Sequence, residues 1–287
     1  MDTRLGRIVD EVKEDTGSGA AEIFKRVLDS LSTVMEHSGD LTVEDLRDFS
    51  IQLHLAKRSM ASLFNLANRI MLSTDANDWK DTLRGSLLAM EKEFQIGMAR
   101  IVENMRSTIR AKRLMTISYS STIIHGLSSL GMEDLEVILP VSLPMGEGRK
   151  MAKALAERGL RAEIIQDSMV YSVMEEVDLA LVGADAVTPQ GVVNKVGTLT
   201  LVAAARHFDL PAYAVCDWMK VSPVHMLDPA EVQTRVANNL TMRELVFEQT
   251  PLEMFTSIIT DRGVLTPQGI RESMGSMPLS DVWASLP

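Results

Sequence analysis

The sequence predicts an α/β protein, in which an N-terminal helical domain precedes a doubly wound parallel sheet. Two observations support this. No proline occurs before Pro140, and apolar residues in the first part recur at spacings of three and four. After Lys112 short apolar runs alternate with helical patterns, which is typical of βα units. We therefore expect a helical domain over 1–112 and a ligand-binding α/β domain over 113–287.

Helices are expected to fill the first domain. Thr42 and Asp45 have the spacing of a capping box, and an amphipathic pattern follows over 41–70. The pattern resumes over 79–110. This half contains no catalytic constellation. His37 and His54 have no partner at metal-ligand spacing, so we expect structural or surface roles for both and no metal site.

The second domain is expected to alternate strands with helices. The predicted strands cover 114–117, 136–139, 162–165, 179–182 and 212–215, and the helices between them cover 122–130, 148–158, 168–176 and 198–208. Ligands bind beyond the carboxyl ends of the strands in such sheets. No Gly-x-Gly-x-x-Gly follows the first strand, so a dinucleotide site is not supported and no cofactor is expected.

Composition excludes several classes of function. The chain has 287 residues, a formal net charge of −10 and one cysteine, Cys216. Direct binding of nucleic acid would require a basic surface, which this balance does not favour. No apolar run is long enough to span a bilayer, and the first thirty residues lack a signal-peptide core. We expect a cytoplasmic protein with no membrane partner, in which the lone cysteine is a small core residue.

The most informative stretch is 181–198, LVGADAVTPQGVVNKVGT. Asp185 follows a buried strand, where desolvation should raise its pKa toward the range useful for proton transfer. Lys195 and the free amides near Gly197 and Thr198 precede a helix, which is a natural anion site. Capping roles for Asp185 and Thr198 explain the same spacing, and the spacing alone leaves both interpretations open.

Two sets of residues carry a resemblance to a known family. The first is VGAD at 182–185, Gly191 and NKVGT at 194–198; the second is SGAA at 18–21, which looks like a glycine-containing phosphate loop. Together they resemble the family that contains the regulatory subunits of eukaryotic initiation factor 2B, ribose-1,5-bisphosphate isomerase and methylthioribose-1-phosphate isomerase. The resemblance covers most of the chain. It implies a Rossmann-like second domain and a homodimer or higher homo-oligomer.

The resemblance also implies site residues. Asp185 matches the catalytic aspartate of the isomerases, and Asn194 and Lys195 match a pair that contacts substrate. Gly19 and Ala20 in the loop and Gly197 in the motif are expected to bind ligand. Lys220, after a later strand, either borders the site or forms a surface ion pair with Asp217.

Three departures from the family pattern bear on catalysis. Ser118 stands where the isomerases have a catalytic cysteine, Ile117 stands where they have a histidine, and Leu143 replaces an arginine that would hold a phosphate. A serine hydroxyl needs a strong adjacent base, whereas a thiol ionises readily. The Tyr119-Ser120 pair is closer to the alpha subunit of the initiation factor.

These departures favour a regulatory protein over an enzyme. We expect an initiation factor 2B-like protein of the alpha-subunit type, with a cleft for a phosphorylated small molecule, either a sugar phosphate or a nucleotide, and an incomplete isomerase set. The alternative is an active aldose-ketose isomerase of sugar 1-phosphates that uses Asp185 with Ser118 as an unusual partner.

Overall fold

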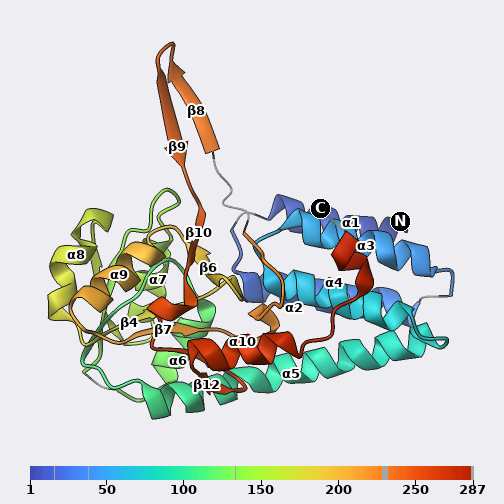
Figure 1. The fold of residues 1–287 in the computed structure, drawn as a ribbon, viewed down its shortest axis with the longest axis horizontal. Helices are drawn as coiled ribbons and strands as arrows, with labels where there is room; N and C mark the ends of the chain where they lie inside the picture. The colour runs from blue at the N-terminus through green and yellow to red at the C-terminus, as the bar shows by residue number, and fades with distance from the viewer. Residues whose placement is uncertain (16, 38, 133, 228–231, 286–287) are drawn as a thin grey trace.

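The computed structural model describes residues 1–15, 17–37, 39–132, 134–227 and 232–285. A bundle of helices lies beside an α/β part along the long axis, and a two-stranded arm projects from between them (Figure 1). The predicted α/β class, with helices first and a mostly parallel sheet after them, is confirmed. No helix within the described ranges is both long and apolar enough to span a membrane.

Helices build the first part around a core of buried aliphatic and phenylalanine side chains. They are α1 (Thr3–Glu14), α2 (Ala20–Glu36), α3 (Val43–Ala56), α4 (Ala61–Thr74) and α5 (Trp79–Thr108). The capping box is present: Thr42 Oγ1 accepts from the Asp45 amide at 3.1 Å, and Asp45 accepts from the Thr42 amide at 3.2 Å. The pattern over 41–70 forms two helices instead of one. The chain breaks at 57–60 because α4 starts on the second part, where the Ala61 amide donates to the Asp185 carbonyl at 3.1 Å.

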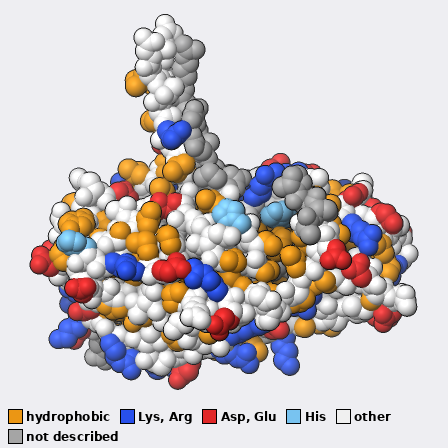
Figure 2. All heavy atoms as spheres, in the orientation of Figure 1, with side chains coloured by type: hydrophobic (Ala, Val, Ile, Leu, Met, Phe, Trp, Pro, Cys, Tyr) orange, Lys and Arg blue, Asp and Glu red, His pale blue; other side chains and the backbone are white. Residues whose placement is uncertain are grey.

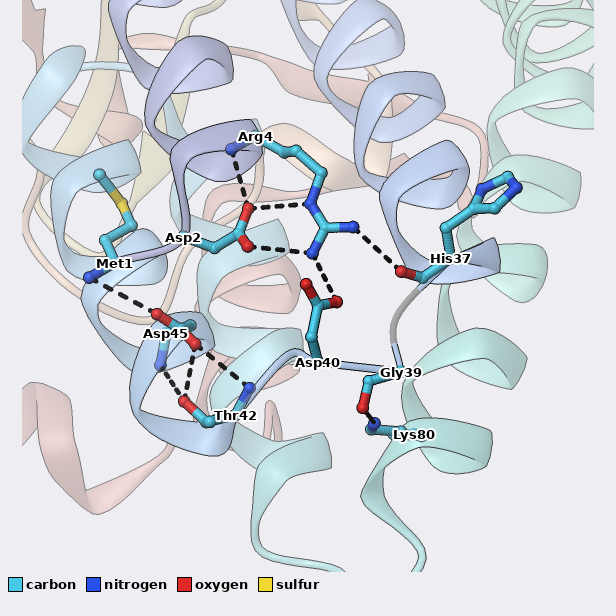
Figure 3. A network of polar contacts seen from close by, with 9 residues as sticks. All are labelled: Met1, Asp2, Arg4, His37, Gly39, Asp40, Thr42, Asp45 and Lys80. Atoms are coloured by element: carbon cyan, nitrogen blue, oxygen red, sulfur yellow. Dashed lines mark hydrogen bonds and ion pairs between the residues drawn. The ribbon is translucent and has the colours of Figure 1, made fainter.

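Charged groups join the ends of three helices near the N-terminus (Figure 3). Asp2 caps α1 by accepting from the Arg4 amide at 2.8 Å. The Arg4 guanidinium pairs with Asp40 at 2.8 Å and donates to the His37 carbonyl at 3.0 Å. These contacts link α1 to the end of α2 and the start of α3. Exposed pairs of this kind contribute little individually, so the apolar core supplies most of the stability here.

The main sheet has seven strands in the order β12-β11-β7-β4-β1-β2-β3. Their bounds are β1 (Arg113–Met115), β2 (Glu136–Pro140), β3 (Arg161–Ile165), β4 (Leu179–Val182), β7 (Ala212–Val215), β11 (Ser257–Thr260) and β12 (Gly263–Leu265). All neighbours pair in parallel except β11 and β12. The chain adds strands on one side of β1 and then on the other, so the order reverses between β1 and β4, where ligands bind in such sheets.

Helices cover both faces of this sheet. The C-terminal part of α5, α6 (Ser121–Ser129) and α7 (Glu147–Ala156) cover one face. The other face is covered by α8 (Val170–Val173), α9 (Thr198–His207) and α10 (Pro267–Gly275). The helix expected over 168–176 is instead a four-residue α8 between two 3₁₀ turns, Asp167–Met169 and Met174–Glu176.

Two antiparallel pieces were not predicted. One is a small sheet in the order β10-β6-β5, made of β5 (Ala186–Thr188), β6 (Gly191–Lys195) and β10 (Phe247–Thr250). The other is the arm, which we define as β8 (Val232–Ala237) and β9 (Leu240–Glu244). Figure 2 shows the arm standing clear of the body. Near the C-terminus Trp283 packs on Phe64 of α4 and on His54, so His54 has a structural place.

Candidate functional site

A cavity of about 430 Å³ opens at the point where the strand order reverses. This volume lies within the range of small-molecule sites. Residues beyond the carboxyl ends of β1 and β4 line it together with the start of α2, the break between α3 and α4, and the start of α7. The lining residues used below are Ser118, Glu147, Lys150, Asp185, Asn194, Lys220, 17–21 and 57–60. The cavity thus collects six of the predicted residues: Gly19, Ala20, Ser118, Asp185, Asn194 and Lys220.

The loop after β1 approaches the loop after β4 very closely. A Cβ at Gly183 would lie 3.1 Å from Ser120 Oγ, which is tighter than an ordinary contact, so a larger residue would require the Ser120 side chain to move. Ser120 caps α6 by accepting from the Ile123 amide. Ser118 has a positive φ of 67°, and its amide donates to Ser142 Oγ at 2.9 Å. These contacts hold Ser118 at the cavity wall in a conformation that costs energy for a non-glycine residue.

Asp185 is fixed by its backbone on two sides. Its amide donates to the Val193 carbonyl at 2.9 Å, and its carbonyl accepts from Ala61. Burial raises the pKa of its carboxyl group, Lys220 opposes this effect, and the negative charge of Glu147 adds to it. The direction agrees with the expectation from the sequence. A carboxyl group beside a cavity can take up or release a proton, and a raised pKa favours its protonated form.

Lys195 and Asn194 lie on β6, not at the mouth of a helix. Lys195 is only 2% exposed, and its Nζ lies 2.9 Å from Glu147 Oε1. Glu147 lines the cavity, whereas Lys195 is not among the lining residues. Asn194 is buried and donates through Nδ2 to Thr198 Oγ1 at 3.0 Å. The predicted lysine is thus buried in an ion pair with Glu147, a cavity-lining carboxylate that sequence reasoning missed.

The expected anion site at the start of α9 needs correction. The amides of Gly197 and Leu199 are not free, because both donate to Glu248 Oε1, at 2.7 and 2.8 Å. Gly197 has a φ of 99°, and a Cβ there would meet Ile117 at 2.8 Å. Gly197 does not line the cavity. A carboxylate of the protein itself occupies the helix N-terminus, where an external anion would otherwise bind.

The start of α2 offers a different anion site. Gly19 is the N-cap residue, and no hydrogen bond joins the amides of Ala20 and Ala21 to any residue that the structure describes. Lys57 donates to the Asp15 carbonyl at 2.8 Å, and Lys150 donates to the Gly17 carbonyl at 3.3 Å. Exposed Arg58 also lines the cavity. Free amides and three cations make this end of the cavity positive.

Residues 215–220 divide between core and cavity. Cys216 is fully buried, burial raises the pKa of its thiol, and it does not line the cavity. Lys220, at the end of the 3₁₀ turn Trp218–Lys220, is 6% exposed and borders the cavity. No described carboxylate lies within ion-pair distance of it, which excludes the surface pair with Asp217 considered from the sequence. No three His, Cys, Asp or Glu side chains within the described ranges are arranged to hold a metal ion.

Comparison with known proteins gives consistent matches. A family model described as the initiation factor 2 subunit family matches residues 13–267. A Pyrococcus horikoshii protein named translation initiation factor eIF-2B subunit 2-like is 28% identical, over 92% of this chain and 97% of its own. A ribose 1,5-bisphosphate isomerase of Haloferax volcanii is 29% identical, over 93% and 91%. The translation initiation factor eIF2B subunit alpha of Caenorhabditis elegans is 26% identical, over 95% and 96%.

Solved structures agree with these matches. The crystal structure of the P. horikoshii translation initiation factor eIF-2B has a TM-score of 0.79 at 26% identity, covering 93% of this chain and 98% of that chain. The 5-methylthioribose 1-phosphate isomerase of the same organism has a TM-score of 0.68 at 21% identity, covering 94% and 86%. At that identity the second likeness is one of fold alone.

Proposed function

The chain belongs to the initiation factor 2 subunit family, and on that premise we propose that it is an initiation factor 2B-like protein of the alpha-subunit type. It binds a sugar phosphate or a nucleotide in the cavity beside Asp185 and acts as a regulatory protein without efficient isomerase activity. The homologues include both initiation-factor subunits and isomerases, so the argument depends on the residues of the cavity.

The observation that carries this proposal is that the cavity holds Asp185 without a thiol. The resemblance implies that the isomerases use a cysteine together with the aspartate. Here the only cysteine, Cys216, is buried outside the cavity. Ser118 takes the expected place, and no residue that the structure describes accepts a hydrogen bond from its hydroxyl group. Loss of one of two cooperating groups costs roughly 10² to 10⁴ in rate.

The positive end of the cavity supports binding of a phosphate group. The amides of Ala20 and Ala21 at the N-terminus of α2 donate to no described residue. Lys57, Arg58 and Lys150 line the cavity beside them. The side chain of Lys150 also lies over the ring of Tyr119, 4.3 Å from its centroid, which positions its ammonium group. Phosphate bound here would be held by backbone donors and by cations together.

Active isomerisation is the second candidate. The raised pKa of Asp185 favours it, because a proton must move between two carbons of the sugar and a carboxyl group whose protonated form is favoured by burial can carry it. Similarity to proteins named ribose 1,5-bisphosphate isomerase also supports it.

A coupled isomerase assay separates the two candidates. It compares wild type, Ser118→Cys and Asp185→Asn on ribose 1,5-bisphosphate and methylthioribose 1-phosphate, with binding of each ligand measured by thermal shift. We expect ligand-induced stabilisation without turnover in wild type. Robust wild-type turnover that Asp185→Asn abolishes would instead establish the enzyme. An absence of stabilisation by any sugar phosphate or nucleotide would contradict the binding site itself.

Assembly and location belong to the same proposal. We propose a cytoplasmic homodimer or higher homo-oligomer, and the projecting arm supports it because isolated two-stranded hairpins are barely stable in water. Val236, Leu240 and Met242 on the arm are exposed to solvent in the single chain. A second chain packed against the arm would cover these side chains.

A further inference from the structure

We infer that the cavity takes a sugar with a single phosphate group, and that Glu147 is the residue that excludes a second one. This inference rests on the proposed function, since it names the ligand class of the same cavity. The resemblance groups the chain with proteins that act on monophosphates and bisphosphates alike, and neither the family nor the fold distinguishes the two.

Lys195 is not available to a second phosphate. Its ammonium group is buried and lies 2.9 Å from Glu147 Oε1. Glu147, at the first position of α7, lines the cavity, whereas Lys195 does not. A ligand at this end therefore meets the carboxylate first, and the positive charge behind it is already neutralised.

The second carboxylate oxygen of Glu147 lacks a hydrogen-bond donor. Oε2 is buried and has no hydrogen-bond partner among the described residues. An unsatisfied buried acceptor is costly, so this carboxylate, whose side chain is 23% exposed, favours a ligand that brings a hydroxyl donor over one that brings only acceptors. A phosphate group at neutral pH offers acceptors and negative charge, so it would be repelled at the same position.

No other group at this end compensates. Glu248 already occupies the start of α9, and Leu143, in place of the family's arginine, is exposed and does not line the cavity. Lys220 is the remaining cation, and it already interacts with two buried carboxyl groups: burial raises the pKa of Asp185 and of Asp217, and Lys220 opposes that rise at both.

At the end of the cavity formed by the start of α2 and residues 57–60, cations outnumber carboxylates. Lys57, Arg58 and Lys150 line it beside the free amides of α2. Its one carboxylate, Asp15, is paired with Arg26 and accepts hydrogen bonds from the Gly17 and Ser18 amides. One phosphate therefore fits the positive end, and the hydroxyl groups of the sugar fit the end with Glu147 and Asp185.

Isothermal titration with ribose 5-phosphate and ribose 1,5-bisphosphate tests the inference. We expect wild type to bind the monophosphate about tenfold or more tightly, because a like charge is placed against the second phosphate. Glu147→Gln keeps the size of the side chain and an acceptor for Lys195 but removes the charge. It should gain affinity for the bisphosphate and reduce the preference several-fold. Glu157→Gln, which removes an exposed carboxylate paired with Lys153 beyond the cavity, should leave the preference unchanged.

The wild-type ratio tests the inference even if Glu147→Gln does not fold. Equal binding of both ligands, tighter binding of the bisphosphate, or an unchanged preference in a folded Glu147→Gln would overturn the role of Glu147 and leave the proposed phosphate site standing. Binding of neither ligand would overturn the proposed function along with it.

Discussion

Asp185 lowers the stability of the folded protein because its carboxyl group is buried beside the cavity. Burial raises the pKa of its carboxyl group above 3.8, although Lys220 opposes the effect. The folded chain therefore holds this proton more tightly than the unfolded chain, and stability falls as the pH rises through the interval between the two pKa values. Burial thus penalises the charged form of Asp185, and a neutral side chain of the same shape would avoid that penalty.

Asp185→Asn should consequently stabilise the protein while it removes the proton-carrying group. We expect the Tm to rise by about 2 °C at pH 7, which corresponds to a fraction of a kcal/mol to 1 kcal/mol for a chain of this size. The difference should shrink as the pH falls through the interval between the folded and the unfolded pKa of Asp185. Thermal unfolding across this range measures it, with the exposed Asp209→Asn as control. A shift that is the same at every pH would contradict the assignment.

Single residues of the site were predictable where a motif names them. Asp185, Asn194 and Lys220 follow strand ends or belong to the family motif, and all three line the cavity. Glu147 was not found, because in the sequence it is only the start of a helical pattern and its partner Lys195 is 48 positions away. The role of residues 57–60 in the cavity was also not predicted. In the sequence they are a short break in an apolar pattern that continues on both sides as a helix.

Among the elements, α9 has an N-terminal cap that no local sequence pattern predicts. Glu248 on β10 accepts from the Gly197 and Leu199 amides, and β10 reaches this place by pairing with β6. Burial raises the pKa of Glu248, while hydrogen bonds from the backbone amides oppose that rise. A carboxylate at a helix N-terminus satisfies amides that have no partner within the helix and interacts favourably with the helix dipole.

Glu248→Ala should therefore destabilise the protein by about 1–2 kcal/mol, as the loss of a helix cap does. The expected readout is a lower midpoint of urea unfolding with an unchanged slope. Glu272→Ala is the matched control, because Glu272 on α10 accepts only from the exposed Gln268 side chain. An unchanged midpoint in Glu248→Ala would mean that water replaces the cap at no cost.

Elements with a strong local pattern were predictable, and the paired ones were not. The parallel strands β1, β2, β3, β4 and β7 are short apolar runs between helical patterns, and each was found within a few residues, whereas β11 was not predicted. The sheet β10-β6-β5 depends on contacts between distant segments. A Cβ at Gly191 would lie 2.3 Å from the Thr250 carbonyl oxygen, so this glycine is required for the approach of β6 to β10. In the sequence the same glycine is only one letter of a motif.

At the scale of the whole molecule, the two parts are joined more extensively than a linker would join them. The first part of α5 packs in the helical bundle and its last part packs on the main sheet. Asn65 of α4 donates to the carbonyl groups of Met219 and Val221 at 2.6 and 2.8 Å, close to Lys220. The cavity lies between these parts, so its walls combine the loop at 17–21 and residues 57–60 from the first half of the sequence with Glu147, Lys150 and Asp185 from the second. No local pattern could reveal that juxtaposition, and the resemblance to a family was needed to relate the loop at 17–21 to Asp185.

The arm leads to the last prediction, which concerns assembly. Its two strands pair only with each other, and its exposed apolar residues Val236, Leu240 and Met242 lie outside every core of the single chain. Stable obligate dimers bury roughly 2,000 Å² or more in total, and an arm that reaches over a second chain adds area that the body alone does not supply. We expect light scattering to give about twice the chain mass of 31.7 kDa at micromolar concentration.

Leu240→Asp with Met242→Asp should shift the protein toward monomer, because burying two carboxylates without partners opposes association. Leu88→Asp, at an exposed leucine of α5, is the control and should remain dimeric. A wild type that scatters as a monomer, or a double variant that still scatters as a dimer, would show that the arm does not hold two chains together.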